Sequence, residues 1–217
     1  MTDAHRFERP DSFSLLLNFL PILQLTCGMV FSWLAFSTPT ARLMTLTLWV
    51  YLLPPLVSRL TLAAFGRPQG QCALDSRAYR VWWFLTQWQM LFNRLPWLEE
   101  LLRLIPGLYA QWIWLWGGHL SPFAYVSPGV LITDRYLVDV ARGAVLGMEC
   151  RLAGHIAIRD GEGRFAVIIA APVVEEASIV GGEAGLGPGA RLRAGQMLPV
   201  GRRVAPFTEW PRRAPSA

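Results

Sequence analysis

The sequence predicts a β-solenoid with α-helices: an N-terminal two-helix membrane hairpin, a helical linker and a C-terminal parallel β-helix. From Val174 to Val204 an aliphatic residue stands at every sixth position. A period of six fits neither an α-helix nor an alternating strand, and it is typical of a coil in which short parallel strands stack turn on turn. The chain is also only 16% charged, against roughly 25% in an average soluble domain, which indicates contact with a membrane.

The membrane hairpin is expected within residues 1–70. Residues 12–37 carry no charge, and this stretch exceeds the ~20 helical residues that cross a hydrocarbon core. A second apolar stretch runs from Leu43 to Phe65, interrupted only by Arg59. The first stretch is too long for a cleaved signal peptide, and a second one follows it. We therefore expect two spanning helices.

Two features of the second helix give further expectations. Pro54 and Pro55 should kink it, because proline removes a helical hydrogen bond. Arg59 should extend its guanidinium to the membrane surface. The loop that connects the two helices holds one basic residue, Arg42. The outer ends of the two helices are flanked by Arg6, Arg9, Arg67, Arg77 and Arg80. By the positive-inside rule both chain ends are expected in the cytoplasm.

Residues 71–120 form the expected linker, which holds most of the ten tryptophans. Apolar residues between positions 81 and 95 fall on one helical face. Pro96 begins a second helix, and a short apolar segment follows the break at Pro106. Amphipathic, Trp-rich helices beside a membrane anchor are expected in the interface; packing against the β-helix or a neighbouring subunit is the open alternative.

Residues 121–217 form the expected β-helix. Two aliphatic runs should fill its interior: Val140, Leu146, Leu152 and Ile158, then Val174, Val180, Leu186, Leu192, Leu198 and Val204. Small residues four positions after most of them should share that interior near the corners: Ala144, Cys150, Ser178, Ala184 and Ala190. Between the runs, the turn dipeptides of residues 159–164, flanked by IAI and FAVII, predict an excursion from the coil.

The segments VARGAV-LGMECR-LAGHIA and VEEASI-VGGEAG-LGPGAR-LRAGQM resemble the hexapeptide-repeat acyltransferases, in their membrane-anchored bacterial branch. The resemblance covers about residues 121–207. It implies a left-handed parallel β-helix, a homotrimer, acetyl-CoA or another acyl-CoA as co-substrate, and loops that overhang the active site. The Gly that usually follows the aliphatic is replaced at several hexads, and the Asn-Pro-Ala ending of sugar acetyltransferases is absent. The expected location is the bacterial cytoplasmic membrane, with the β-helix on the cytoplasmic side where acyl-CoA is available.

Acyl transfer to a hydroxyl needs a base, and histidine titrates near neutrality. His155 lies inside a hexad just before the excursion, and its position resembles that of the family's general base; a histidine that merely closes a corner is the alternative. Asp139 falls about one turn earlier and is the candidate that orients it, with a solvated turn aspartate as the alternative.

His119, near the start of the coil, is the next candidate base, and His5 lies in the N-terminal tail. Cys150 should point inward, which disfavours a nucleophile.

The family binds acyl-CoA in a groove between subunits, largely through backbone groups. The resemblance places Gly181, Gly182, Gly185 and Gly187 in the matching turns. Guanidinium groups bind phosphate, so Arg191 and Arg193, with Arg202 and Arg203, are candidates for the coenzyme phosphates; each is otherwise a solvated surface charge. The Gly-rich stretch lacks the Lys-Ser/Thr ending of a phosphate loop.

Composition excludes several other classes. All twenty basic residues are Arg, so lysine Schiff-base chemistry is excluded. The net charge of +5 comes without a nucleic-acid motif and is expected to serve a membrane surface. Three cysteines make no disulfide framework, and too few histidines are present for a three-ligand zinc site, so no metal is expected.

Two functions remain open at this point. The first is a membrane-anchored O-acyltransferase that moves an acetyl or similar group from coenzyme A to a hydroxyl of a glycan, a lipid-linked molecule or a secreted product. The second is a non-catalytic β-helix scaffold that organises a membrane biosynthetic complex. His155 and the excursion favour catalysis, whereas the thinned hexad motif favours the scaffold.

Overall fold

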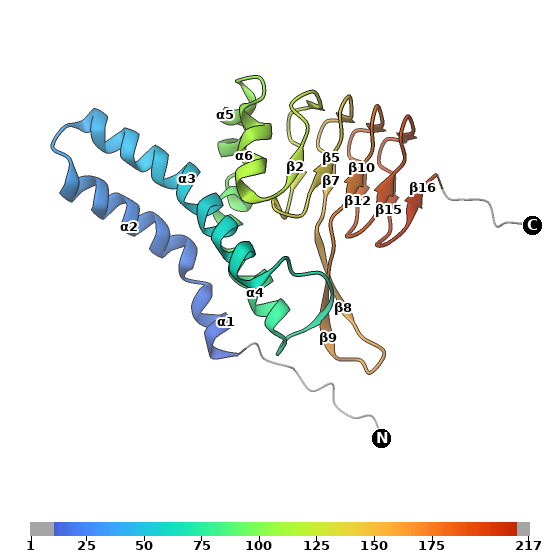
Figure 1. Cartoon of the computed structure of the whole chain (residues 1–217), viewed down its shortest axis with the longest axis horizontal. Coiled ribbons are helices and arrows are strands. Elements are labelled where there is room, and N and C mark those ends of the chain that lie inside the picture. The colour runs from blue at the N-terminus through green and yellow to red at the C-terminus, as the bar shows by residue number, and fades with distance from the viewer. Residues whose placement is uncertain (1–10, 212–217) are drawn as a thin grey trace, which may run out of the picture.

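The computed structural model describes residues 11–211 (Figure 1). His5, Arg6 and Arg9 lie outside the described residues. A helical hairpin stands at one end of the molecule, three shorter helices lie in the middle, and the coil extends to the other end. One continuous hydrophobic core includes side chains from the hairpin, the middle helices and the coil.

The hairpin consists of α1 (Ser12–Leu17), α2 (Leu20–Ala35) and α3 (Pro39–Phe65). The first predicted helix is thus divided, because Pro21 has no N–H to bond the carbonyl of Leu17. The helices α2 and α3 pack closely: a Cβ on Gly28 would lie 2.6 Å from the Trp49 ring. Two stretches, Ser12–Ala35 and Pro39–Phe65, are long and apolar enough to cross a membrane.

Helix α3 continues through Pro54 and Pro55, and the expected kink at these prolines stays a prediction. Pro55 cannot bond the carbonyl of Tyr51, and the Trp112 indole N–H donates to that oxygen instead at 2.8 Å. The prolines therefore create an acceptor for a neighbouring helix.

Arg59 has hydrogen-bond partners within the protein, and its expected reach to the membrane surface stays a prediction. Its guanidinium donates to the carbonyls of Trp114 and Leu115, and Ser58 Oγ donates to that of Trp116. These are the last carbonyls of α6, which lack N–H donors from a following helical turn, and the helix dipole favours a cation beside them. Arg59 thus joins α3 to the helix that leads into the coil.

The middle helices are α4 (Arg77–Arg94), α5 (Trp97–Arg103) and α6 (Leu108–Trp116). Part of this Trp-rich segment packs inside the protein, since Trp82, Trp112 and Trp116 are buried. Trp97 and Trp114 are more than half exposed, and placement of the segment in the membrane interface, which can hold together with packing, stays a prediction. A buried ion pair joins these helices to the coil, because Arg135 Nε donates to Glu99 Oε1 at 2.8 Å. The chain packs closely where it enters the coil, since a Cβ on Gly118 would lie 2.0 Å from the Arg135 carbonyl oxygen.

The coil is a parallel β-helix with three sheets, which confirms the prediction. The first sheet contains β2 (His119–Leu120), β5 (Asp139–Val140), β10 (Val173–Val174), β13 (Arg191–Leu192) and β16 (Glu209–Trp210). The second contains β3 (Tyr125–Val126), β6 (Val145–Leu146), β11 (Ile179–Val180) and β14 (Met197–Leu198). The third contains β4 (Leu131–Ile132), β7 (Arg151–Leu152), β12 (Gly185–Leu186) and β15 (Arg203–Val204).

The interior of the coil matches the hexad pattern. The predicted aliphatics from Val140 to Leu152 and from Val174 to Val204 are buried. The small residues Ala144, Cys150, Ser178, Ala184 and Ala190 are completely buried between them. Each strand pairs in register with the strand three hexads later in the chain, as Val180 pairs with Leu198. Apolar burial on this scale is the main stabilising term of the coil.

Two interruptions break the coil near its start. The first is a short turn at residues 133–138, where the chain takes two more residues than the hexads require. The second is the predicted excursion, a hairpin of β8 (His155–Arg159) and β9 (Phe165–Ile169). Ile158 therefore lies in this hairpin and not in the coil interior as predicted. The hairpin pairs with β1 (Gly70–Ala73), which follows α3, in an antiparallel sheet of order β1-β9-β8.

Candidate active site

The two interruptions meet at a histidine–aspartate pair. His155 is the first residue of β8, and its Nδ1 lies 2.6 Å from Oδ2 of Asp134 in the short turn. The two residues are 21 apart in sequence. Asp134 is buried, whereas 29% of the His155 side chain remains exposed. A buried carboxylate behind a partly exposed imidazole is the usual arrangement of an oriented base.

Asp134 is held from several sides. Thr133 Oγ1 donates to its Oδ2 at 2.6 Å, and the Trp82 indole N–H donates to its Oδ1 at 3.3 Å. Gly154 makes room for it, because a Cβ there would lie 2.8 Å from the Asp134 Cβ. The Trp82 ring also contacts the imidazole of His155, with ring centroids 4.9 Å apart. Helix α4 and the coil together therefore fix the position of both members of the pair.

The electrostatics follow from this geometry. Burial of the His155 imidazole disfavours its charged form, but the hydrogen bond and the negative charge of Asp134 outweigh burial and raise the pKa of His155 above 6.5. Burial alone would raise the pKa of Asp134, yet its hydrogen bonds and the nearby imidazole lower that pKa below 3.8. Asp134 thus stays ionised at neutral pH. It accepts the Nδ1 proton of His155, which leaves Nε2 as the basic nitrogen.

The structure does not bring the predicted Asp139 to His155. Asp139 on β5 lies beside His119 on β2, with Oδ1 and Nδ1 2.8 Å apart. Both side chains are at least half exposed. The reason is register: the turn at 133–138 adds residues, so Asp139 falls in the first sheet and Asp134 takes the place behind His155.

A groove of about 520 Å³ adjoins His155 and runs along the third sheet. One wall carries Arg151 and Arg203, which point outward from β7 and β15. The turn residues Gly187, Pro188 and Pro206 also line it. The groove is open, and the basic imidazole of His155 is part of its lining.

The predicted coenzyme-binding residues lie in different places. Gly187 lines the groove, as does Gly185. Gly181 instead serves coil stacking, because a Cβ there would lie 2.6 Å from the Leu198 carbonyl oxygen, and Gly182 lies in the same turn. Arg191 and Arg193 lie on the first sheet, away from the groove, where they pair with Glu175 at 2.5 Å and Glu209 at 3.0 Å.

Other chemistry-bearing groups are placed as follows. Cys150 is completely buried in the coil, and burial raises the pKa of its thiol to about 12, so it stays protonated. Within residues 11–211, no three His, Cys, Asp or Glu side chains form a group that could hold a metal ion.

No protein-family model matches the chain, and no curated protein matches it. Among solved structures it is similar to a hexapeptide-repeat-containing acetyltransferase of Vibrio cholerae O1 biovar eltor, solved with acetyl coenzyme A: 15% identity, TM-score 0.30, over 42% of this chain and 57% of that one. It is also similar to serine acetyltransferase isoform 3 of Entamoeba histolytica, solved with cysteine: 13% identity, TM-score 0.25, over 100% and 87% of the chains. A serine acetyltransferase of Neisseria gonorrhoeae, solved with serine, gives 12% identity and a TM-score of 0.25 over 90% and 82%. The fold itself is established by the strand register described above.

Sequence reasoning missed Asp134, although a signal for it exists. Aliphatics stand at Val126 and Ile132, one hexad apart, and the next in-phase residue, Val140, comes two positions late. This delay in the six-residue repeat indicates extra residues in the turn, and Asp134 lies in that turn. The indole of Trp82 has no such signal, because only the folded packing of α4 brings it to the turn.

Proposed function

We propose that this protein is a membrane-anchored acyltransferase that uses acetyl-CoA or another acyl-CoA and a hydroxyl acceptor. The observation that carries the proposal is the buried Asp134 behind a partly exposed His155 that lines the groove. An O-acyl transfer needs a base beside a space that can hold the acyl donor, and a groove lined by His155 supports this assignment. The solved structures named above add only that such coils occur in acetyltransferases.

The chemistry assigns a role to each atom of the pair. Nε2 of His155 takes the proton of the acceptor hydroxyl as its oxygen attacks the thioester carbonyl. The carbon–sulfur bond then breaks, the acyl group stays on the acceptor oxygen, and the proton passes to the departing thiolate of coenzyme A. Asp134 keeps Nδ1 protonated and stabilises the transient imidazolium.

The groove suggests where the donor lies. Its wall of Gly185, Gly187 and Pro188 carries no long side chain and so leaves room for a pantetheine arm. Arg151 and Arg203 are suited to the coenzyme phosphates, since guanidinium groups bind phosphate through paired hydrogen bonds. Arg191 and Arg193 are less suited, because carboxylates of the same coil already pair with them.

His155→Ala tests the catalytic proposal. We expect acyl-CoA consumption by the purified protein, followed as free thiol with a mixture of hydroxyl acceptors, to fall about 10²- to 10⁴-fold. His119→Ala is the matched control, because it removes the imidazole of the exposed pair and should leave turnover within about twofold. A wild-type protein without any acyl-CoA turnover that co-purifies with a synthase would support the scaffold instead.

Membrane anchoring and trimerisation are further parts of the proposal. The hairpin exposes many large apolar side chains, among them Leu16, Phe19, Leu34, Leu43 and Leu60, as expected of a surface that faces lipid. The second sheet of the coil has an outward ladder of Tyr125, Val145, Ile179 and Met197, which suits a subunit interface. Resistance of the membrane-bound protein to an alkaline wash and a three-chain cross-linked species in detergent are the expected results.

A further inference from the structure

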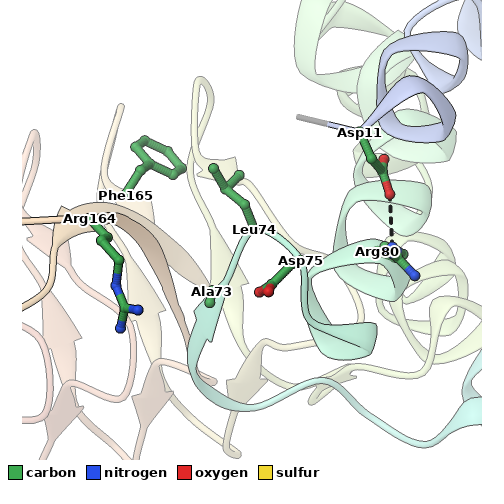
Figure 2. Close-up of a pocket in the computed structure, with 7 residues that line it drawn as sticks. All are labelled: Asp11, Ala73, Leu74, Asp75, Arg80, Arg164 and Phe165. Carbon is green, nitrogen blue, oxygen red and sulfur yellow. Dashed lines mark hydrogen bonds and ion pairs between the residues drawn. The ribbon is translucent and has the colours of Figure 1, made fainter. Parts of the chain in front are cut away.

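Two adjoining pockets lie where α1 begins and α3 ends, far along the β8–β9 hairpin from His155. One is an apolar groove of about 290 Å³ between α1, α3 and α4, lined by Phe13, Thr61, Phe65, Arg77, Arg80, Val81 and Phe84. The other is a polar pocket of about 360 Å³ lined by Asp11, Ala73, Leu74, Asp75, Arg80, Arg164 and Phe165 (Figure 2). Arg80 belongs to both.

The apolar groove has the chemistry of a lipid chain site with a positive rim. Its walls are aromatic and aliphatic side chains, and Phe13 and Phe65 are more than half exposed. Its two charged residues are Arg77, whose guanidinium lies over the Phe65 ring at 5.1 Å, and Arg80. None of the groove's lining residues that the structure describes is acidic. Asp11 of the adjoining pocket pairs with Arg80 at 2.9 Å, so Arg77 is the cation that chiefly favours an anion at the rim.

The polar pocket has a different character. Figure 2 shows Asp11 joined to Arg80, with Asp75 between them and Arg164. The Arg80–Asp11 distance is 2.9 Å, and Arg80 is still 48% exposed. Asp11 and Asp75 can accept hydrogen bonds, and the two guanidinium groups can donate them. Arg164 also pairs with Asp160 and Glu162, each at 3.1 Å. Such a mixed lining suits the polar part of a head group that lies beyond its phosphate.

In a hairpin that spans the membrane, these pockets would lie at the depth of the lipid head groups. Phe13 lies in the first turn of α1, and Phe65 ends α3, so both ends of the predicted hairpin meet here. Basic pockets between spanning helices on the cytoplasmic side bind anionic lipid head groups.

We propose that these two pockets form one binding site for a phosphate-bearing membrane lipid. An acyl chain lies in the apolar groove, the phosphate lies between Arg77 and Arg80, and the rest of the head group enters the polar pocket. This inference rests on the membrane-spanning part of the proposed function and does not depend on acyl transfer.

Native mass spectrometry of the full chain in detergent tests the site with dioleoylphosphatidylglycerol as the probe. We expect the wild type to retain this lipid, and Arg80→Gln to weaken retention about fivefold or more. Phe65→Asp, which places a carboxylate beside Arg77, should weaken it as well without altering Arg80. Arg42→Gln is the matched control: it changes a half-buried arginine in α3 near the loop at the other end of the hairpin and should leave retention unchanged.

Two further probes separate the sources of the phosphate. Dioleoylglycerol has the same chains without phosphate and should be retained weakly, and soluble glycerol phosphate should not displace the phospholipid. Full displacement by glycerol phosphate would overturn the lipid assignment in favour of a soluble phosphate ligand. Equal retention by the wild type and both groove variants would overturn the site itself. A protein that stays soluble without detergent or membranes would instead contradict the spanning hairpin.

Discussion

The early and late turns of the coil follow the same six-residue repeat, but only the early turns are interrupted. From β10 to β16 the strands pair hexad by hexad, and their inward side chains are buried. Between β4 and β10 the repeat is broken by the turn at 133–138 and by the β8–β9 hairpin. The pair of Asp134 and His155 lies where these two breaks meet. The regular turns thus supply stability and one groove wall, and the interruptions supply the candidate chemistry.

This contrast predicts that inward substitutions in the late turns destroy the fold. Leu186 is 2% exposed, so Leu186→Asp buries a carboxylate without a partner. Such burial costs several kcal/mol against a total stability of about 5–15 kcal/mol. We expect the variant to be unfolded or to melt far below the wild type by circular dichroism.

Val200→Asp is the control for that experiment. Val200 lies in a turn of the same region and is 70% exposed, so its variant should melt within a few degrees of the wild type. A Leu186→Asp protein with a wild-type melting curve would show that the hexad register is wrong.

Substitutions at the interruptions should instead change activity and its pH dependence. Turnover in the wild type should rise with pH as His155 loses its proton, with a midpoint above 6.5. Asp134→Asn removes the charge that raises the pKa of His155. We expect turnover to fall about a hundredfold and the midpoint to move to lower pH. A variant with an unchanged midpoint would contradict the pairing.

The same pair has a defined effect on stability. Because the folded pKa of His155 is raised, its contribution is complete below about 6.5 and is lost as pH rises through the folded value. Because the folded pKa of Asp134 is lowered, its contribution is present above about 3.9 and is lost as pH falls through the folded value. The pair therefore stabilises the fold most between these limits.

Periodic features were predictable from the sequence, whereas contacts between distant segments were not. The six-residue period indicated which side chains fill the coil, and two short apolar strands around turn dipeptides indicated the β8–β9 hairpin. Asp139 was chosen from spacing alone, and the extra residues in the turn moved Asp134 to that place. The pairing of β1 with β9 and the contacts of Arg59 depend on how the helices pack on the coil. Neither has a local pattern that predicts it.

The smallest predicted effect tests whether α4 takes part in positioning the pair. Trp82→Phe removes the indole hydrogen bond to Asp134 Oδ1 and keeps an aromatic ring beside His155. Asp134 retains Thr133 and His155 as partners, so we expect turnover to fall about two- to fivefold with a small shift of the pH midpoint.

Trp83→Phe is a matched control, because it loses an indole hydrogen bond to the carbonyl of Ser14 and not to Asp134. Both variants should melt slightly earlier than the wild type, but only Trp82→Phe should change turnover and the pH midpoint. Equal turnover in the two variants would mean that the coil alone positions Asp134 and that α4 serves only packing.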